Sequence, residues 1–458
     1  MTNIVVITGR GISRRNATVE LIRRLQRADY RVTYVSEFDY ADVAAHLNIP
    51  FVRLNVQKPT EYTSPDRPQA PTSIIKRSMR VVRRFLQRRT RQVQLLDQYE
   101  TRQQSVHAQL ADLAPDLVLV DIEMHVTMMI VHHAGYRVIS LSDFQALYKR
   151  RGIPPMHHYL IPDRTLWSDL HVELAWLIYR IRKWGRFCKA WLTQAGADPR
   201  SSLAAYARRI GYDGQHSWAY YQWPYPVLFD HLPILTLNAT EFDFPHDLHP
   251  NVHYAGPMIR LDRAEVMPDA DAHQRLTHIL TQHADSTERK LIYCTFGTFL
   301  RRDDTAFISR IIAAIAQNPD WTLIIGLGGR YAPIALGETL PANVHAFAWV
   351  PQLRVLEHAD CTIMHSGPAT IYECIHFDVP MLVYPFDFND QMGYAARVAY
   401  HGLGIVSQRT DSTAMITAHI QRLLMDETFR DNRQRMRDYF QQYAHDQRAA
   451  KIIEQFVR

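Results

Sequence analysis

Residues 349–391, WVPQLRVLEHADCTIMHSGPATIYECIHFDVPMLVYPFDFNDQ, decide the fold class. The apolar runs CTIMHSG (361–367) and PMLVYPF (380–386) have the length of short buried strands. Between them, small residues are followed by an apolar pattern through Tyr372 and Ile375, which predicts a loop that opens a helix. A strand, a helix and a second strand in this order predict a parallel α/β sheet.

The same alternation extends in both directions from this stretch. Buried-strand runs precede it at 290–298, 322–329 and 344–350, with a helical pattern at 307–316. The first half repeats the theme in the runs IVVIT (4–8), RVTYVS (31–36), DLVLVD (116–121) and RVISLS (137–142). We therefore predict an α/β fold of two doubly wound domains, with a ligand cleft at the carboxyl ends of the strands.

The boundary between the domains is expected near an acidic, proline-broken segment. Residues 262–288 have the composition of a linker, which gives a first domain at 1–261 and a second at 289–458. The pattern leaves open whether the last helix packs back on the first domain. The acidic residues DAD (269–271) imitate a metal-binding motif, but they lie in the linker, and no metal site is expected there.

Composition narrows the class of protein. With 458 residues, 47% of them hydrophobic and 21% charged, the chain can bury large cores. A net charge of +6 is small for this length and gives no reason to expect a nucleic-acid partner. The four cysteines have no CxxC spacing, and neither a secretion signal nor an apolar run of membrane-spanning length is evident. A cytoplasmic protein is expected.

The segment after the strand at 361–364 has the features of an anion site. His365 and Thr370 flank small residues that include Gly367, and a helix follows. Free backbone N–H groups at a helix N-terminus attract anions, and a nearby His can add a hydrogen bond. This loop could therefore hold a diphosphate and stabilise its charge as it leaves.

The motifs WxPQ, HxG with a following Thr, a Glu, and PxxxxPxxxxDQ occur here in one order. This order resembles the donor-binding box of the family 1 glycosyltransferases, which include UDP-glucuronosyl and plant secondary-metabolite glycosyltransferases. The runs PDLVLVD, PILTLNATEFDFP, NVHYAGPM and CTFGT also resemble landmarks of the family. The resemblance implies the GT-B fold, in which two Rossmann-like domains face each other across a cleft: the first binds the acceptor and the second the nucleotide-sugar donor.

The resemblance also implies roles for individual residues. By this resemblance, Trp349 contacts the uracil, Gln352 contacts the nucleoside and Glu373 contacts the ribose. His365, Gly367 and Thr370 contact the phosphates, and Asp390 and Gln391 contact the transferred sugar. Thr298 either lines the phosphate side of the cleft or caps a helix. Pro368 and Ala369 depart from the family's HGGxGT pattern, which predicts a differently shaped loop because Pro lacks an N–H and Ala avoids positive φ.

The acceptor side departs further from the family. Inverting members use a His near the end of the first strand as base, with an Asp as its partner; here Arg14 stands at the position of that His. Asp121 follows the strand at 116–121 and matches the partner Asp. Three alternatives remain: Asp121 is the base, His125 is the base, or Arg14 forms a buried salt bridge with Asp121 and leaves no base.

Two basic stretches have no assigned role in this scheme. Residues 76–91 carry eight Lys or Arg around one apolar stripe, and residues 174–192 combine basic side chains with Trp and Phe. Each is expected either to pack on the first domain, with the second stretch enclosing an acceptor pocket, or to contact an anionic membrane peripherally.

These observations predict a glycosyltransferase of hexoses. We expect it to move a hexose, with glucose favoured by Gln391, from a UDP-sugar to a hydroxyl of an apolar small-molecule or lipid-like acceptor, with inversion. Neither a metal nor another cofactor is expected. The alternatives are a catalytically weakened module that binds a nucleotide sugar and activates a partner, and a sugar-nucleotide epimerase.

Overall fold

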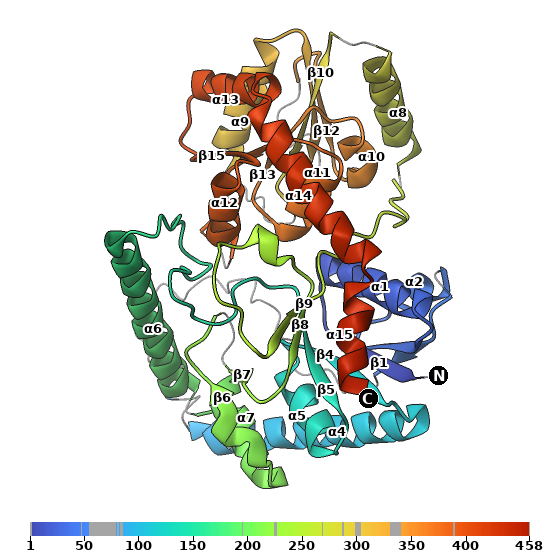
Figure 1. The fold of residues 1–458 in the computed structure, drawn as a ribbon, viewed down its shortest axis with the longest axis vertical. Coiled ribbons are helices and arrows are strands. Elements are labelled where there is room, and N and C mark those ends of the chain that lie inside the picture. The colour runs from blue at the N-terminus through green and yellow to red at the C-terminus, as the bar shows by residue number, and fades with distance from the viewer. Residues whose placement is uncertain are drawn as a thin grey trace.

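The computed structural model describes residues 2–46, 48–54, 79, 82, 86–194, 196–223, 227–267, 269–285, 288–297, 304–329, 340–387 and 390–457, without the side chains of 88 and 89. Within these ranges the chain forms two α/β units, each built on one parallel sheet with helices packed against it (Figure 1). The prediction of two wound α/β domains is thereby confirmed. The predicted site residue Thr298 and most of 76–91 lie outside the described residues.

The first sheet has seven strands in the order β3-β2-β1-β4-β5-β8-β9. The strands are β1 (Asn3–Thr8), β2 (Arg31–Ser36), β3 (Phe51–Arg53), β4 (Leu117–Asp121), β5 (Val138–Ser142), β8 (Ile234–Thr236) and β9 (Val252–Tyr254). The helices of this half are α1 (Ile12–Arg27), α2 (Ala41–His46), α4 (Arg88–Leu113), α5 (His125–His133), α6 (Leu166–Gln194) and α7 (Pro199–Ile210). Short 3₁₀ turns, η1 (Asp213–Ser217) and η2 (Thr240–Phe242), and an antiparallel pair, β6 (Trp218–Ala219) with β7 (Leu228–Phe229), complete it.

The second sheet has six strands in the order β12-β11-β10-β13-β14-β15. The strands are β10 (Lys290–Thr295), β11 (Trp321–Gly326), β12 (Val344–Phe347), β13 (Cys361–Met364), β14 (Met381–Val383) and β15 (Gly404–Val406). The helices are α8 (Ala270–Ala284), α9 (Thr305–Ala316), α10 (Gln352–Leu356), α11 (Pro368–His376), α12 (Gln391–Tyr400), α13 (Thr413–Met425), α14 (Thr428–His445) and α15 (Arg448–Val457). The predicted strand runs supply the central strands of both sheets.

The central strands are buried on both faces, which explains their continuous apolar sequences. In β1, every residue from Ile4 to Thr8 is buried, and β4 is buried throughout. Parallel strands covered by helices on both sides lack the alternation of polar and apolar residues found in half-exposed sheets. Because all strands of one sheet run in the same direction, their carboxyl ends meet at one edge. In each half, this edge carries the predicted site residues.

The two halves are packed tightly together by α12 and α14. Arg397 on α12 forms a salt bridge with Asp243 of the first half, and both side chains are fully buried. The backbone N–H of Gly393 donates to the carbonyl of Met156 at 2.7 Å. A side chain at Gly393 would collide with that carbonyl, so glycine permits this close approach.

The C-terminal segment crosses from the second half to the first, as Figure 1 shows. Helix α14 runs along both halves, and the Tyr443 hydroxyl lies 2.7 Å from the Thr240 hydroxyl of the first half. Helix α15 then packs on α1 and β9, with Ile452 and Ile453 buried in the core of the first domain. The last helix therefore belongs to the first domain in space, although it follows the second in sequence.

Helix α6 stands at the side of the first half (Figure 1). It exposes a long stripe of apolar side chains. It extends well beyond the predicted 174–192 stretch. Its exposed large apolar side chains are Leu166, Trp167, Leu170, Leu174, Leu177, Ile178, Ile181, Trp184, Trp191 and Leu192. Among the described residues, no helix combines the length and the apolar character that crossing a membrane requires.

Candidate functional site

The loop between β13 and α11 forms the centre of the donor side. Ser366 adopts a left-handed conformation with φ of 65°, and Gly367 precedes the first helical residue, Pro368. Proline is tolerated at this first position because the N–H it lacks has no intrahelical partner there. Ala369 lies within the helix and needs no positive φ. The two departures from the family pattern are thus accommodated, and Ser366 takes the strained conformation.

His365 lies beneath this helix N-terminus, against two glycines. A Cβ at Gly367 would come within 2.9 Å of His365 Nε2, and one at Gly297 within 3.2 Å of Cε1. The spacing HxG therefore leaves room for the imidazole ring. Burial lowers the pKa of His365 to about 4, so the ring is neutral at physiological pH. A neutral imidazole has one N–H. His365 also has a hydrogen bond with the Thr295 backbone, which raises its pKa, so an anion would compete with that backbone group for the N–H.

Three predicted nucleoside and phosphate residues contact one another directly. The Gln352 side-chain amide donates to Glu373 at 2.6 Å and to the Thr370 hydroxyl at 3.3 Å, while its oxygen accepts from Tyr293 at 3.3 Å. Glu373 is buried on α11, and Gln352 begins α10. The network joins Tyr293 of β10 to residues that follow β12 and β13 in the chain.

A linker residue completes this network, and the sequence analysis did not identify it. The Arg263 guanidinium forms a salt bridge with Glu373 and another, at 2.6 Å, with Glu265. Glu265 in turn accepts the backbone N–H of Leu353 at 2.8 Å. Burial raises the pKa of Glu265, and Arg263 opposes that shift. Arg263 therefore forms a salt bridge with Glu373, the residue for which a ribose contact is predicted.

The remaining donor residues lie around this surface. Trp349 follows β12 and is half-buried against the core. Gln391 begins α12, and its side-chain oxygen accepts the Phe386 N–H at 2.9 Å. Asp390 lies directly before it. Burial raises the pKa of Asp390 to about 7, and the negative charges of Asp143 and Glu123 add to this effect. Asp390 thus faces the first domain.

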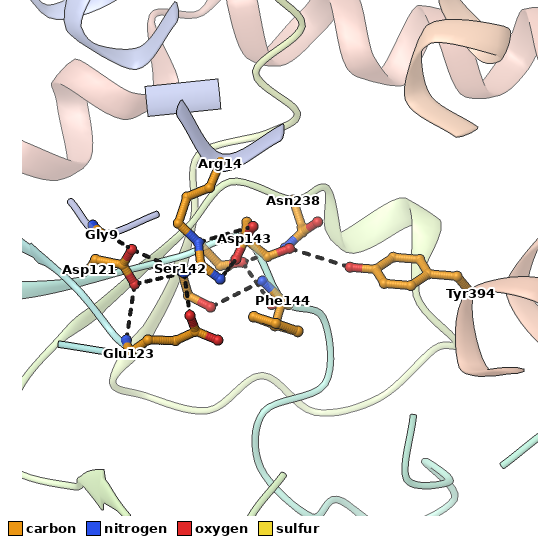
Figure 2. A network of polar contacts seen from close by, with 10 residues as sticks. Gly9, Arg14, Asp121, Glu123, Ser142, Asp143, Phe144, Asn238 and Tyr394 are labelled. Carbon is orange, nitrogen blue, oxygen red and sulfur yellow. Dashed lines mark hydrogen bonds and ion pairs between the residues drawn. The ribbon is translucent and has the colours of Figure 1, made fainter. Parts of the chain in front are cut away.

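On the acceptor side, Arg14 binds three carboxylates, as Figure 2 shows. Its guanidinium lies 3.1 Å from Asp121, 2.6 Å from Glu123 and 3.2 Å from Asp143. Asp121 is buried and also accepts the backbone N–H groups of Gly9 and Glu123. Burial raises the pKa of Asp121 to about 6, although Arg14 opposes the shift. The structure therefore forms the salt bridge that was one of the three alternatives.

The His125 side chain is held by the backbone of the first domain. It begins α5, and its Nε2 lies 2.9 Å from the backbone carbonyl of Val227. Burial lowers the pKa of His125. Its contacts belong to the core of the first domain, close to Phe229. His125 also borders the Arg14 cluster, since Glu123, a partner of Arg14, raises its pKa.

Asp143 is the carboxylate that the sequence analysis missed. It follows β5, and its backbone carbonyl accepts the hydroxyl of Tyr394 from α12 (Figure 2). Asp143 lines a cavity of about 70 Å³ between the domains, together with Arg263 and with Pro368 and Glu373 of α11. Its position directly after a buried strand, in the run RVISLSD, was the available signal.

Comparisons with known proteins show what this chain resembles. Residues 231–448 match the family described as UDP-glucoronosyl and UDP-glucosyl transferase. The chain is 32% identical over 133 residues to oleandomycin glycosyltransferase of Streptomyces antibioticus, and the aligned segment covers 29% of each protein. It is 24% identical over 231 residues to zeaxanthin glucosyltransferase of Pantoea ananas, and the aligned segment covers 50% of each protein. The match thus spans half or less of the length of these relatives.

Solved structures resemble the whole chain. The glycotransferase of kitacinnamycin superimposes with a TM-score of 0.66 at 20% identity, over 100% of this chain and 99% of that one. The calicheamicin glycosyltransferase gives a TM-score of 0.64 at 17% identity, over 100% and 98%. These likenesses establish the two-domain glycosyltransferase fold. Over residues 231–448 the chain thus resembles the UDP-glucoronosyl and UDP-glucosyl transferases, and its two domains have the GT-B glycosyltransferase fold.

Proposed function

We propose that the protein transfers a hexose, with glucose preferred, from a UDP-sugar to a hydroxyl group of an apolar acceptor, with inversion at the anomeric carbon. The observation that best supports this proposal is the hydrogen-bond network of Gln352, Thr370 and Glu373, which lies beside His365 and the N-terminus of α11. It combines acceptors for ribose hydroxyls with donors for phosphate oxygens. Gln391 at the start of α12 supports glucose as the sugar.

The donor diphosphate would be stabilised by fixed dipoles. The first N–H groups of α11 have no partner within the helix, and the positive end of the helix dipole lies at the same point. His365 lies buried at the same point. Its single N–H, which the Thr295 backbone also attracts, would donate to the diphosphate when the donor binds, since a hydrogen bond to a charged group is strong. We therefore propose that transfer requires no metal ion or other cofactor. Turnover in the presence of a chelator should equal turnover without it.

We assign the acceptor base to Asp143, in place of Asp121 and His125. Asp143 lines the cavity between the domains, whereas Asp121 is enclosed by Arg14 and two backbone N–H groups. The Asp143 carboxylate would take the acceptor's hydroxyl proton as the oxygen attacks the anomeric carbon. The bond from that carbon to the diphosphate breaks on the opposite face, and its electron pair leaves with UDP. Arg14 would keep Asp143 in place.

A screen of donors and acceptors tests this function. UDP-glucose, other UDP-sugars and TDP-glucose are each incubated with a panel of apolar phenols and alcohols, and products are identified by mass spectrometry. We expect release of UDP that depends on the acceptor, with β-linked products from α-linked donors. Hydrolysis or rearrangement of the donor without any acceptor product would contradict the proposal.

A binding module without catalysis is the second candidate. It is favoured by Arg14, which stands where the usual base is expected and binds Asp121. In this case the protein would bind UDP but give no product with any member of the panel. Calorimetric titration with UDP, run beside the screen, distinguishes this candidate from an enzyme.

Peripheral contact with an anionic membrane is a further part of the proposal. The outer stripe of α6 exposes 73% of Trp167, 58% of Trp184 and 51% of Trp191, and the exposed Arg182, Arg186 and Lys189 lie near it on the same helix. Apolar side chains flanked by basic ones are typical of helices that lie in a membrane interface. Co-sedimentation with phosphatidylserine vesicles, but not with phosphatidylcholine vesicles, is expected, and Trp167→Ser combined with Trp191→Ser should abolish it.

A further inference from the structure

The first half contains a cavity of about 530 Å³ between α6 and α7. Its walls include the aromatic side chains of Tyr179, Trp184, Phe187, Tyr220, Tyr221 and Trp223. Asp387, from the same loop as the sugar-contacting Asp390 and Gln391, also lines it. The cavity therefore extends from the acceptor domain to the donor loop, and it has the volume of a typical small-molecule site.

Four cationic side chains line this cavity: Arg182, Lys183, Arg186 and Arg200. Arg200 lies between two rings, with its guanidinium carbon 4.3 Å from the centre of Phe187 and 3.8 Å from the centre of Tyr220. Within the described part of the chain, no salt bridge joins Arg182, Arg186 or Arg200 to a carboxylate. Positive charge in this cavity thus exceeds what the protein neutralises.

The acidic residues of the cavity do not balance these cations. Asp198 caps the N-terminus of α7 by accepting the Ser201 N–H at 3.1 Å. Asp387 lies at the donor end. Burial, together with the charges of Arg186 and Arg200, lowers the pKa of Lys183 to about 7. Burial is the main cause, and the neighbouring cations act in the same direction.

Trp223 adds a hydrogen-bond donor without a partner. Its side chain is 5% exposed, and its indole nitrogen has no hydrogen-bond partner among the described residues. Its ring stacks on His157, whose pKa is lowered to about 4, chiefly by burial. A buried N–H of this kind is costly unless a ligand or water accepts from it.

We propose that this cavity binds an acceptor that carries an anionic group, such as a carboxylate, sulfate or phosphate, on an aromatic or other apolar body. The aromatic walls would contact the body, and the guanidinium groups would bind the anion through paired hydrogen bonds. Because Asp387 repels an anion, the anionic end lies away from the donor loop and the reactive hydroxyl lies towards it. The transfer to that hydroxyl rests on the proposed function, but the binding itself does not.

Binding of matched acids and esters, measured without donor, tests this proposal. The probes are two pairs: p-hydroxycinnamate and its methyl ester, and an ω-hydroxy fatty acid and its methyl ester. Binding of each probe is measured by calorimetry and by the fluorescence of the cavity's tryptophans. A charge-assisted hydrogen bond to an anion predicts that at least one acid binds about tenfold more tightly than its ester. Loss of selectivity is expected in the variant Arg182→Gln/Arg186→Gln. Lys189→Gln is the matched control, because Lys189 lies on the same helix but does not line the cavity.

Each outcome decides the proposal. Preference for an acid in the parent protein and in Lys189→Gln, with loss of that preference in the double variant, supports it. Equal binding of each acid and its ester, or an acid preference that the double variant retains, overturns it. Binding of UDP is measured in the same preparations. A protein that binds UDP but no acid refutes the anion site and leaves the proposed function standing, whereas one that binds an acid but not UDP refutes the donor site alone.

Discussion

The donor and acceptor edges of the cleft are built in opposite ways. At the donor edge, Gln352, Thr370 and Glu373 bind one another, and all come from one short stretch of sequence. At the acceptor edge, one guanidinium, that of Arg14, draws together carboxylates that follow two different strands. A site for a common ligand can be held by a compact motif. A site whose residues are far apart in sequence can change its chemistry by a single substitution, as at Arg14.

The largest effect is expected at the acceptor edge. Asp143→Asn removes the proposed base but keeps the shape of the side chain, and kcat should fall by about 10² to 10⁴, the usual contribution of a positioned base. Donor affinity should be unchanged. Steady-state kinetics with the acceptor found in the screen, together with UDP calorimetry, measure both. If Asp121→Asn lowers kcat more than Asp143→Asn does, the assignment of the base is wrong.

At the donor edge, His365→Ala should lower kcat by about 10² to 10³, because one buried hydrogen-bond donor to the leaving diphosphate is lost. The acceptor affinity should not change. His358→Ala is the matched control, since His358 lies between α10 and β13 and outside the network. Turnover of His365→Ala equal to that of the control would refute the phosphate role of His365.

A smaller effect separates the two partners of the linker salt bridge. Glu373→Gln should weaken UDP binding about tenfold to a hundredfold, since a hydrogen bond from a ribose hydroxyl to a carboxylate is lost. Arg263→Gln should leave UDP binding equal or tighter, because Arg263 competes with the ribose for that carboxylate. Calorimetry measures both. Equal weakening in the two variants would show that Arg263 itself binds the nucleotide.

The smallest effect is a pH dependence of stability. The pKa of Asp121 is raised from 3.8 to about 6 in the folded protein, so its contribution to stability is present at low pH and is lost as the pH rises through 6. Between pH 5 and 7.5 the free energy of unfolding of the parent protein should fall by on the order of 1–2 kcal/mol relative to that of Asp121→Asn. Denaturant unfolding of both proteins measures this difference. A constant difference across that range, as expected for the exposed control Asp112→Asn, would contradict the shifted pKa.

The sequence predicted the central strands, and it grouped Gln352, Thr370 and Glu373, which lie in contact through Gln352, because both depend on local patterns. Buried parallel strands are continuous apolar runs, and the donor motif keeps its spacing on one loop and two helices. The three-residue strands β3 and β15 were not predicted, because Phe51–Arg53 and Gly404–Val406 are too short to show a period. Their places are fixed by pairing with β2 and β14.

Contacts between residues that are distant in sequence could not be predicted either. The salt bridge of Arg14 with Asp121 could be stated only as one alternative, since strand order decides whether the two residues meet. Asp143 and Arg263 were missed because each has an unremarkable neighbourhood in sequence and gains its role by facing the other domain. The cations on α6 were visible as a basic stretch, but only the fold shows that four cationic side chains enclose one cavity.

The return of α15 to the first domain has a practical consequence for recombining this protein with relatives. A chimera cut only within 262–288 would combine one protein's first domain with another protein's α15. The apolar face of Ile452 and Ile453 would then meet an α1 and β9 to which it was never fitted. An exchange of donor specificity therefore needs a second crossover near His445, so that α15 stays with the domain that it covers.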